Sequence, residues 1–136
     1  MAKKTISIFG CTGSVGTTTL DIIRENKEQF EVKVLTANKN IDDLILFANE
    51  FNPEAICFNN ASDLEKVKNE INTDKMEYYI GDEGLLECAK ICTDIVVAGI
   101  VGLAGLRPLL ESIKNSKKVC IANKECFVSA GSLIMS

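Results

Sequence analysis

The chain has 136 residues, 46% hydrophobic and 25% charged, a composition typical of one soluble globular domain. Its net charge of -4, with no basic block, argues against a nucleic-acid partner but permits a phosphorylated ligand held by backbone N–H groups. Six cysteines without histidine, Cys-x-x-Cys or a signal peptide predict neither zinc nor disulfides and indicate a reducing cytoplasm. The longest apolar run, Ile95 to Leu106, is too short to cross a membrane.

Strands and helices are expected to alternate along the whole chain. In order, the expected elements are a strand over 5–9, a helix over 14–26, a strand over 31–36, a helix over 41–51, a strand over 55–58, a helix over 62–71 opened by a Ser62/Glu65 capping box, a strand over 78–80, a helix over 83–91, a strand over 94–98, a helix over 106–115, a strand over 118–122 and a helix from 125. This alternation predicts an α/β fold: a Rossmann-type, doubly wound parallel sheet with helices on both faces, in one domain spanning 1–136.

The first strand runs into a glycine-rich turn, Gly10-Cys11-Thr12-Gly13-Ser14-Val15-Gly16, that opens the first helix. In this context the spacing is typical of a dinucleotide-binding turn. Glycine lets the backbone come close to a pyrophosphate, and the free N–H groups at the helix start attract its charge. The alternative is a plain strand-to-helix turn.

The turn after the second strand, Thr36-Ala37-Asn38-Lys39-Asn40, contains no acidic residue. A carboxylate there would bind the ribose hydroxyls of NAD, whereas Lys39 and two amides suit a 2′-phosphate. The turn therefore favours NADP over NAD, unless Lys39 is only a solvated surface lysine.

Two later turns belong to the same edge of the predicted sheet, because parallel strands end together. Residues 99–105 repeat the glycine spacing without hydroxyls or charge, which fits either a wall beside the nicotinamide or tight helix packing. At Asn123-Lys124-Glu125, Lys124 can hold a substrate phosphate or polarise a hydroxyl, and Glu125 can bind a ribose or an amide. Alternatively these residues only begin a helix.

Together these turns resemble the N-terminal domain of the 1-deoxy-D-xylulose 5-phosphate reductoisomerase family over essentially the whole chain. The resemblance rests on 10–16 with Thr19-Leu20-Asp21, on 37–40, on 98–102 with 104–106, and on 121–125. It implies NADPH-dependent isomerisation and reduction of a pentulose phosphate to 2-C-methyl-D-erythritol 4-phosphate, in non-mevalonate isoprenoid synthesis.

The resemblance also implies residue roles. The pyrophosphate region would be held by Thr12, Gly13, Ser14 and Val15, beside Gly10, and the 2′-phosphate by Asn38, Lys39 and Asn40. Asn123 and Glu125 would contact NADPH, and Lys124 the sugar phosphate. Asn38 replaces a common glycine, and Cys11 and Cys126 replace serines, which is expected to raise sensitivity to oxidation.

Family members are longer, and their Asp-Ser-Glu metal segment does not occur here. We therefore expect an N-terminal fragment without catalytic residues, metal ligands or the C-terminal helical domain. The ligands of a Mg or Mn ion would lie outside this chain. The chain alone should bind NADPH without turning over substrate. The whole protein would be a homodimer in a bacterial cytoplasm or a plastid, with no nucleic-acid or membrane partner.

Three other interpretations compete with this resemblance. A short-chain dehydrogenase needs Tyr-x-x-x-Lys, but Asp82 and Glu83 stand four residues after the two tyrosines. Aspartate-semialdehyde dehydrogenase needs an Asn-Cys pair and a histidine, which this chain lacks around Cys126. A non-enzymatic, nucleotide-sensing Rossmann module remains the alternative.

Overall fold

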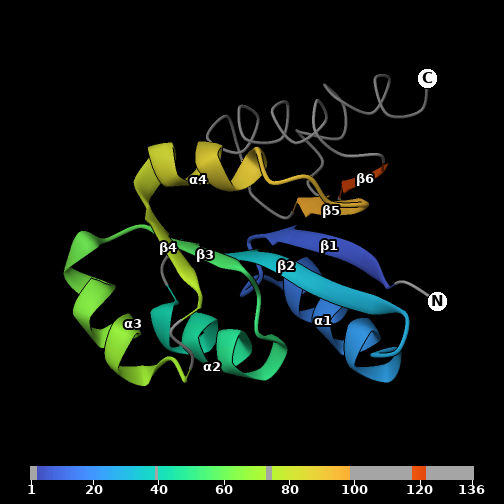
Figure 1. The fold of residues 1–136 in the computed structure, drawn as a ribbon, viewed down its shortest axis with the longest axis horizontal. Coiled ribbons are helices and arrows are strands. Elements are labelled where there is room, and N and C mark those ends of the chain that lie inside the picture. The colour runs from blue at the N-terminus through green and yellow to red at the C-terminus, as the bar shows by residue number, and fades with distance from the viewer. Residues whose placement is uncertain (1–2, 39, 73–74, 99–117, 122–136) are drawn as a thin grey trace.

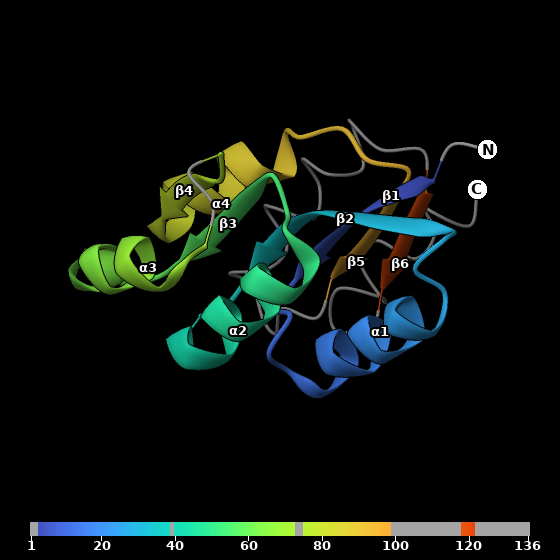
Figure 2. The same cartoon turned by 60° about the horizontal axis from the view of Figure 1, so that its bottom comes forward.

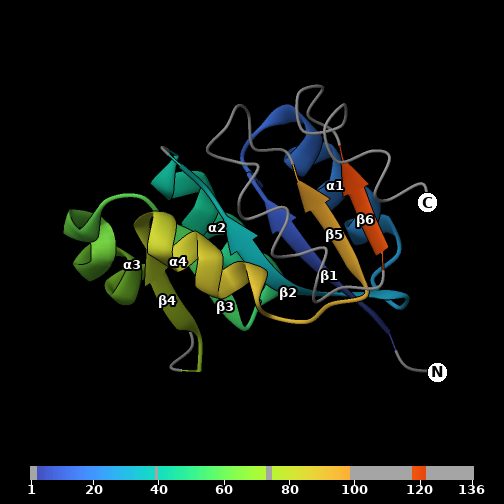
Figure 3. The same cartoon turned by 90° about the horizontal axis from the view of Figure 1, so that it is seen from above.

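The computed structural model describes residues 3–38, 40–72, 75–98 and 118–121. Its centre is a sheet of six strands in the order β4-β3-β2-β1-β5-β6, and every neighbouring pair is parallel (Figure 3). The strands are β1 (Lys4–Phe9), β2 (Phe30–Thr36), β3 (Ala55–Phe58), β4 (Glu77–Ile80), β5 (Ile95–Ala98) and β6 (Lys118–Ile121).

Helices cover both faces of this sheet. One face carries α1 (Ser14–Glu25), α2 (Ile41–Phe51) and α3 (Leu64–Glu70), and the other carries α4 (Gly81–Ala89) (Figures 1 and 2). The expected doubly wound α/β fold with helices on both faces is therefore confirmed.

Each face has its own apolar core. On the face of α1 and α2, buried strand residues such as Ile8 and Leu35 pack with Leu20 of α1 and Leu44 of α2. On the α4 face the smaller core consists of Phe9, Val34, Ala55, Cys57, Cys88, Ala89 and Val96. Burial on both faces explains why these strands are almost continuously apolar rather than alternating.

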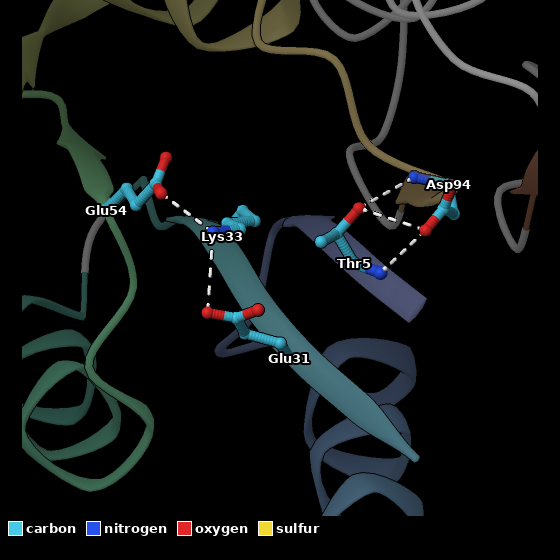
Figure 4. A network of polar contacts seen from close by, with 5 residues as sticks. All are labelled: Thr5, Glu31, Lys33, Glu54 and Asp94. Carbon is cyan, nitrogen blue, oxygen red and sulfur yellow. Dashed lines mark hydrogen bonds and ion pairs between the residues drawn. The ribbon is translucent and has the colours of Figure 1, made fainter. Parts of the chain in front are cut away.

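A bulge in β2 adjusts which face its side chains reach. Ile6 pairs with Val32 and Ser7 with Val34, so Lys33 has no partner of its own in β1. Its ammonium lies 2.7 Å from Glu54 and 3.4 Å from Glu31 (Figure 4). The extra residue sends Val34 toward α4 and Leu35 toward α1 and α2.

A second polar contact joins β1 to the start of β5. The Asp94 carboxylate accepts hydrogen bonds from the N–H and hydroxyl of Thr5, at 3.0 and 3.3 Å, and the Asp94 N–H donates to the Thr5 hydroxyl at 3.0 Å (Figure 4). These bonds lie at the amino ends of the two strands. They fix the alignment of β1 and β5, and hence the position of their carboxyl ends.

The strand order reverses at β1. From β4 at one edge the chain crosses to β5, which pairs with the other side of β1. Phe9 at the end of β1 lies opposite both Thr36 and Ala98, so the carboxyl ends of β2, β1 and β5 coincide. Ligands of doubly wound folds bind at this kind of switch point.

Several expected elements differ in detail. The Ser62/Glu65 capping box is wrong: 61–63 form a 3-10 turn, and α3 then begins at Leu64 without a side-chain cap. Helix α4 begins at Gly81, two residues before the expected start, and ends at Ala89. The expected helices over 106–115 and from 125 lie outside the described residues.

Candidate cofactor site at the carboxyl edge of β1 and β2

The loop between β1 and α1 needs glycine at two defined positions. Gly10 has a φ of 82°, a left-handed conformation that side chains disfavour. A Cβ added at Gly16 would lie 2.4 Å from the Gly10 oxygen and 2.5 Å from the Cys11 Cα. The first turn of α1 therefore packs directly on the backbone of the loop. At Gly13 the nearest atom to an added Cβ is at 3.5 Å, so this position has room.

Thr36, the last residue of β2, holds this loop in place. Its carbonyl accepts hydrogen bonds from the N–H groups of Gly10 and Cys11, at 3.1 and 2.8 Å, and its hydroxyl accepts from Gly10 at 3.0 Å. Thr36 is 2% exposed, so these bonds are shielded from water. From its sequence Thr36 is expected only at the end of the second strand and the start of the following turn, and no sequence signal predicts this role.

The amino end of α1 is left open for an anion. Its N-cap residue, Gly13, makes no side-chain capping bond, and its first turn has no acidic residue. The other three α-helices in the described part of the chain each carry at least one acidic residue there. Because a carboxylate in the first turn would compensate the positive end of the helix dipole, α1 keeps the strongest attraction for an external phosphate.

The predicted phosphate-binding residues occupy this loop and helix start. Thr12 is half-buried and Gly13 is exposed, between β1 and α1. Ser14 and Val15 are the first two residues of α1, where backbone N–H groups have no partner within the helix.

The turn after β2 lies next to this loop, since Thr36 connects the two. Asn38 and Asn40 are both exposed, as binding to a solvent-facing phosphate requires. Asn40 is also the N-cap of α2: its Oδ1 accepts from the Asp43 N–H at 3.3 Å, and its Nδ2 donates to Asp43 Oδ2 at 2.7 Å. Asp43 is not among the residues predicted for the site, although its Asn-x-x-Asp spacing from Asn40 resembles a capping box.

The expectation that Cys11 raises sensitivity to oxidation is wrong, because this side chain is buried. Its thiol is fully buried, and burial above all, with a smaller contribution from the negative charge of Asp43, raises its pKa to about 12. Oxidation proceeds through the thiolate, so this cysteine is protected. Cys11, Cys57, Cys88 and Cys92 are thiols rather than disulfides, as expected for those four.

The remaining predicted residues lie outside the described part of the chain. They are Lys39, the loop 99–105, Asn123, Lys124, Glu125 and Cys126. Within the described ranges no three His, Cys, Asp or Glu side chains gather as a metal site. No helix in those ranges is long and apolar enough to cross a membrane.

Comparison with known proteins identifies the family. The family model for 1-deoxy-D-xylulose 5-phosphate reductoisomerase matches residues 6–131. The chain belongs to this family. A reductoisomerase of this name from Clostridium perfringens is 42% identical over 135 residues, and one from Lachnospira eligens is 41% identical over 134. The match covers 97% of this chain, but the chain spans only 35% of the length of the C. perfringens protein.

Solved reductoisomerase structures share the fold. The enzyme from Zymomonas mobilis in complex with NADPH superposes with a TM-score of 0.88 at 36% identity, over 98% of this chain and 35% of that one. A complex with NADPH, fosmidomycin and magnesium gives a TM-score of 0.84, also at 36% identity, over 97% of this chain and 33% of the other. The resemblance read from the four turns is confirmed at the level of family and fold.

Proposed function

We propose that this chain is the NADPH-binding part of a reductoisomerase that converts 1-deoxy-D-xylulose 5-phosphate to 2-C-methyl-D-erythritol 4-phosphate. One observation of the structure carries the proposal. The amino end of α1 has no acidic residue in its first turn and packs on a glycine loop at the switch point of the sheet, which supports binding of a dinucleotide pyrophosphate there. A family relative solved with NADPH supports the choice of cofactor.

The residues present fit this cofactor. Gly10 supplies the left-handed conformation of the loop, and Gly16 lets the first turn of α1 pack on the loop backbone, so that the loop and the helix start can together present N–H groups to the ligand. The N–H groups of Ser14 and Val15, at the start of α1, would bind the pyrophosphate, and the Thr12 and Ser14 hydroxyls would be further donors. NADPH would supply the hydride for the reduction.

The turn after β2 would determine the preference for NADPH. Asn38 and Asn40 offer amide donors to the 2′-phosphate, and Lys39 a positive charge. By resemblance to the family, Asn123 and Glu125 would contact the cofactor, and Lys124 the substrate phosphate.

The rest of the reaction would need residues beyond this chain. A relative's structure contains fosmidomycin and magnesium, which suggests a phosphorylated substrate and a divalent metal for this protein too. The ligands of that Mg or Mn ion would come from outside these residues. We further propose a homodimer located in the cytoplasm, or in a plastid if the source has one.

The test is a fluorescence titration of the chain with NADPH and NADH. The wild type should prefer NADPH, and Lys39→Glu should abolish that preference because it places a carboxylate at the 2′-phosphate. Lys27→Glu, with the same change of charge just after α1, is the matched control and should keep the preference. Equal binding of both cofactors, or none, would contradict the proposal.

A second experiment tests the proposal that this chain binds NADPH but needs further residues for catalysis. The 136-residue chain should bind NADPH yet show no steady-state turnover of the sugar phosphate. A sugar-phosphate effect on NADPH binding that disappears in Lys124→Ala would favour an enzyme fragment over a nucleotide sensor. Measurable turnover by the chain alone would contradict the proposal that catalysis needs residues beyond it.

A further inference from the structure

Asp43, in the first turn of α2, is held against the turn that follows β2. Both polar atoms of the Asn40 side chain bind it, one to its backbone N–H at 3.3 Å and the other to its carboxylate at 2.7 Å. The neighbouring carboxylate, Asp42, instead pairs with Lys66 of α3 at 2.5 Å. Two adjacent acidic residues are thus directed to different places.

The charge of Asp43 also acts on the glycine loop. It contributes to the raised pKa of the Cys11 thiol, behind the larger effect of burial. Cys11 is bonded through its N–H to Thr36, so the two loops and Asp43 lie within one small region. No ion pair among the described residues includes Asp43, so none of the cations placed by the structure neutralises it.

We infer that Asp43 sets how strongly this chain discriminates between NADPH and NADH. This rests on the proposed function, in which the cofactor's adenosine ribose lies at Asn38 and Asn40. The Asp43 carboxylate repels a 2′-phosphate there, and it can accept a hydrogen bond from the 2′-hydroxyl of NADH. On this inference the preference for NADPH is weaker than the absence of acidic residues from 36–40 implies, because the α2 cap holds the Asp43 carboxylate beside the turn.

The experiment compares wild type, Asp43→Asn and Asp42→Asn by titration with both cofactors at low salt. The Asp43→Asn substitution keeps the hydrogen bond from the backbone N–H of residue 43 to Asn40. Its amide oxygen can still accept from the Asn40 side chain, as the carboxylate oxygen does, so that only the charge is removed. The ratio of the NADH to the NADPH dissociation constant should rise about threefold in Asp43→Asn, mainly through tighter NADPH binding. It should change much less in Asp42→Asn, and at about 0.5 M salt the effect should shrink.

The outcomes separate the inference from the proposed function. If wild type prefers NADPH and the ratio stays unchanged in Asp43→Asn, or shifts equally in both variants, the inference is overturned and the proposed function stands. Weaker NADPH binding by Asp43→Asn also overturns the inference, since removing a charge that repels the 2′-phosphate should make NADPH bind more tightly. If no variant binds either cofactor, the proposed function fails and the inference falls with it.

Discussion

The substitution Gly16→Ala tests how the glycine loop is built. Its added methyl group would lie 2.4 Å from the Gly10 oxygen, 2.5 Å from the Cys11 Cα and 2.7 Å from the Cys11 carbonyl carbon. Real Cβ atoms do not approach other heavy atoms this closely, and all three neighbours are backbone atoms. The loop must therefore move, although Thr36 holds the same two residues by hydrogen bonds.

The expected magnitude follows from two opposing effects. Alanine in a helix is favoured over glycine by about 1 kcal/mol. Forcing an extra methyl into a packed position typically costs about 1–3 kcal/mol, and here the rigid neighbours place the cost at the upper end. We expect a net loss of about 2 kcal/mol in the free energy of unfolding, the opposite sign from an ordinary glycine-to-alanine change in a helix.

The assay is urea unfolding followed by circular dichroism, with Gly13→Ala as the matched control. At Gly13 the nearest atom to the new methyl group is 3.5 Å away, so only the weaker capping of alanine remains, about 0.5 kcal/mol. NADPH affinity should fall about tenfold or more in Gly16→Ala, since the displaced loop carries the phosphate-binding N–H groups. A Gly16→Ala chain as stable as wild type would refute the reasoning.

Three further predictions concern other parts of the fold. Arg24 lowers the pKa of the Glu50 carboxylate from its ordinary value of 4.5, chiefly through their hydrogen bond. The pair should therefore stabilise the chain fully above pH 4.5, and this stabilisation should be lost as the pH falls through the lowered pKa of Glu50. Arg24→Ala should cost about 1 kcal/mol at pH 7 and show a smaller loss of stability on acidification, measured by urea unfolding across pH. The Asn49 side chain donates a hydrogen bond to the carbonyl of Glu70, the last residue of α3, and accepts one from the N–H of Asn72 just beyond it. Asn49→Ala removes both bonds and should lower the unfolding free energy by about 1–3 kcal/mol in the same assay. With a thiol reagent, exposed Cys92 should react in the native chain while Cys11 reacts only after unfolding, and equal rates would contradict the burial of Cys11.

Much of the fold could be predicted because local signals agree with the tertiary structure. Helix α2 begins and ends where expected, at Ile41 and Phe51, because Asn40 caps it and Pro53 follows it. The strands are short apolar runs between turns, and parallel pairing then fixes which ends meet. The position of the glycine loop at the switch point follows from that order alone.

The structure differs from the sequence-based predictions where a side chain has several possible local partners and the sequence does not show which one it contacts. Ser62 and Glu65 have the spacing of a capping box, yet the chain forms a 3-10 turn there and neither side chain caps α3. Asp43 lies outside the turn in sequence, and only the Asn40 cap brings its charge to the site. Cys11 stands in an exposed-looking glycine turn but points into the core, which the sequence spacing does not reveal.

The most direct test of the account is an NMR titration of the ¹⁵N-labelled chain with NADPH. The largest amide shifts should fall on Gly10 to Val15 and on 38–40, at the carboxyl ends of β1 and β2. The amides around Thr5 and Asp94, at the opposite ends of β1 and β5, should not move. Shifts centred on Thr5 and Asp94, or no shifts at saturating NADPH, would contradict the claim that the glycine loop binds the cofactor.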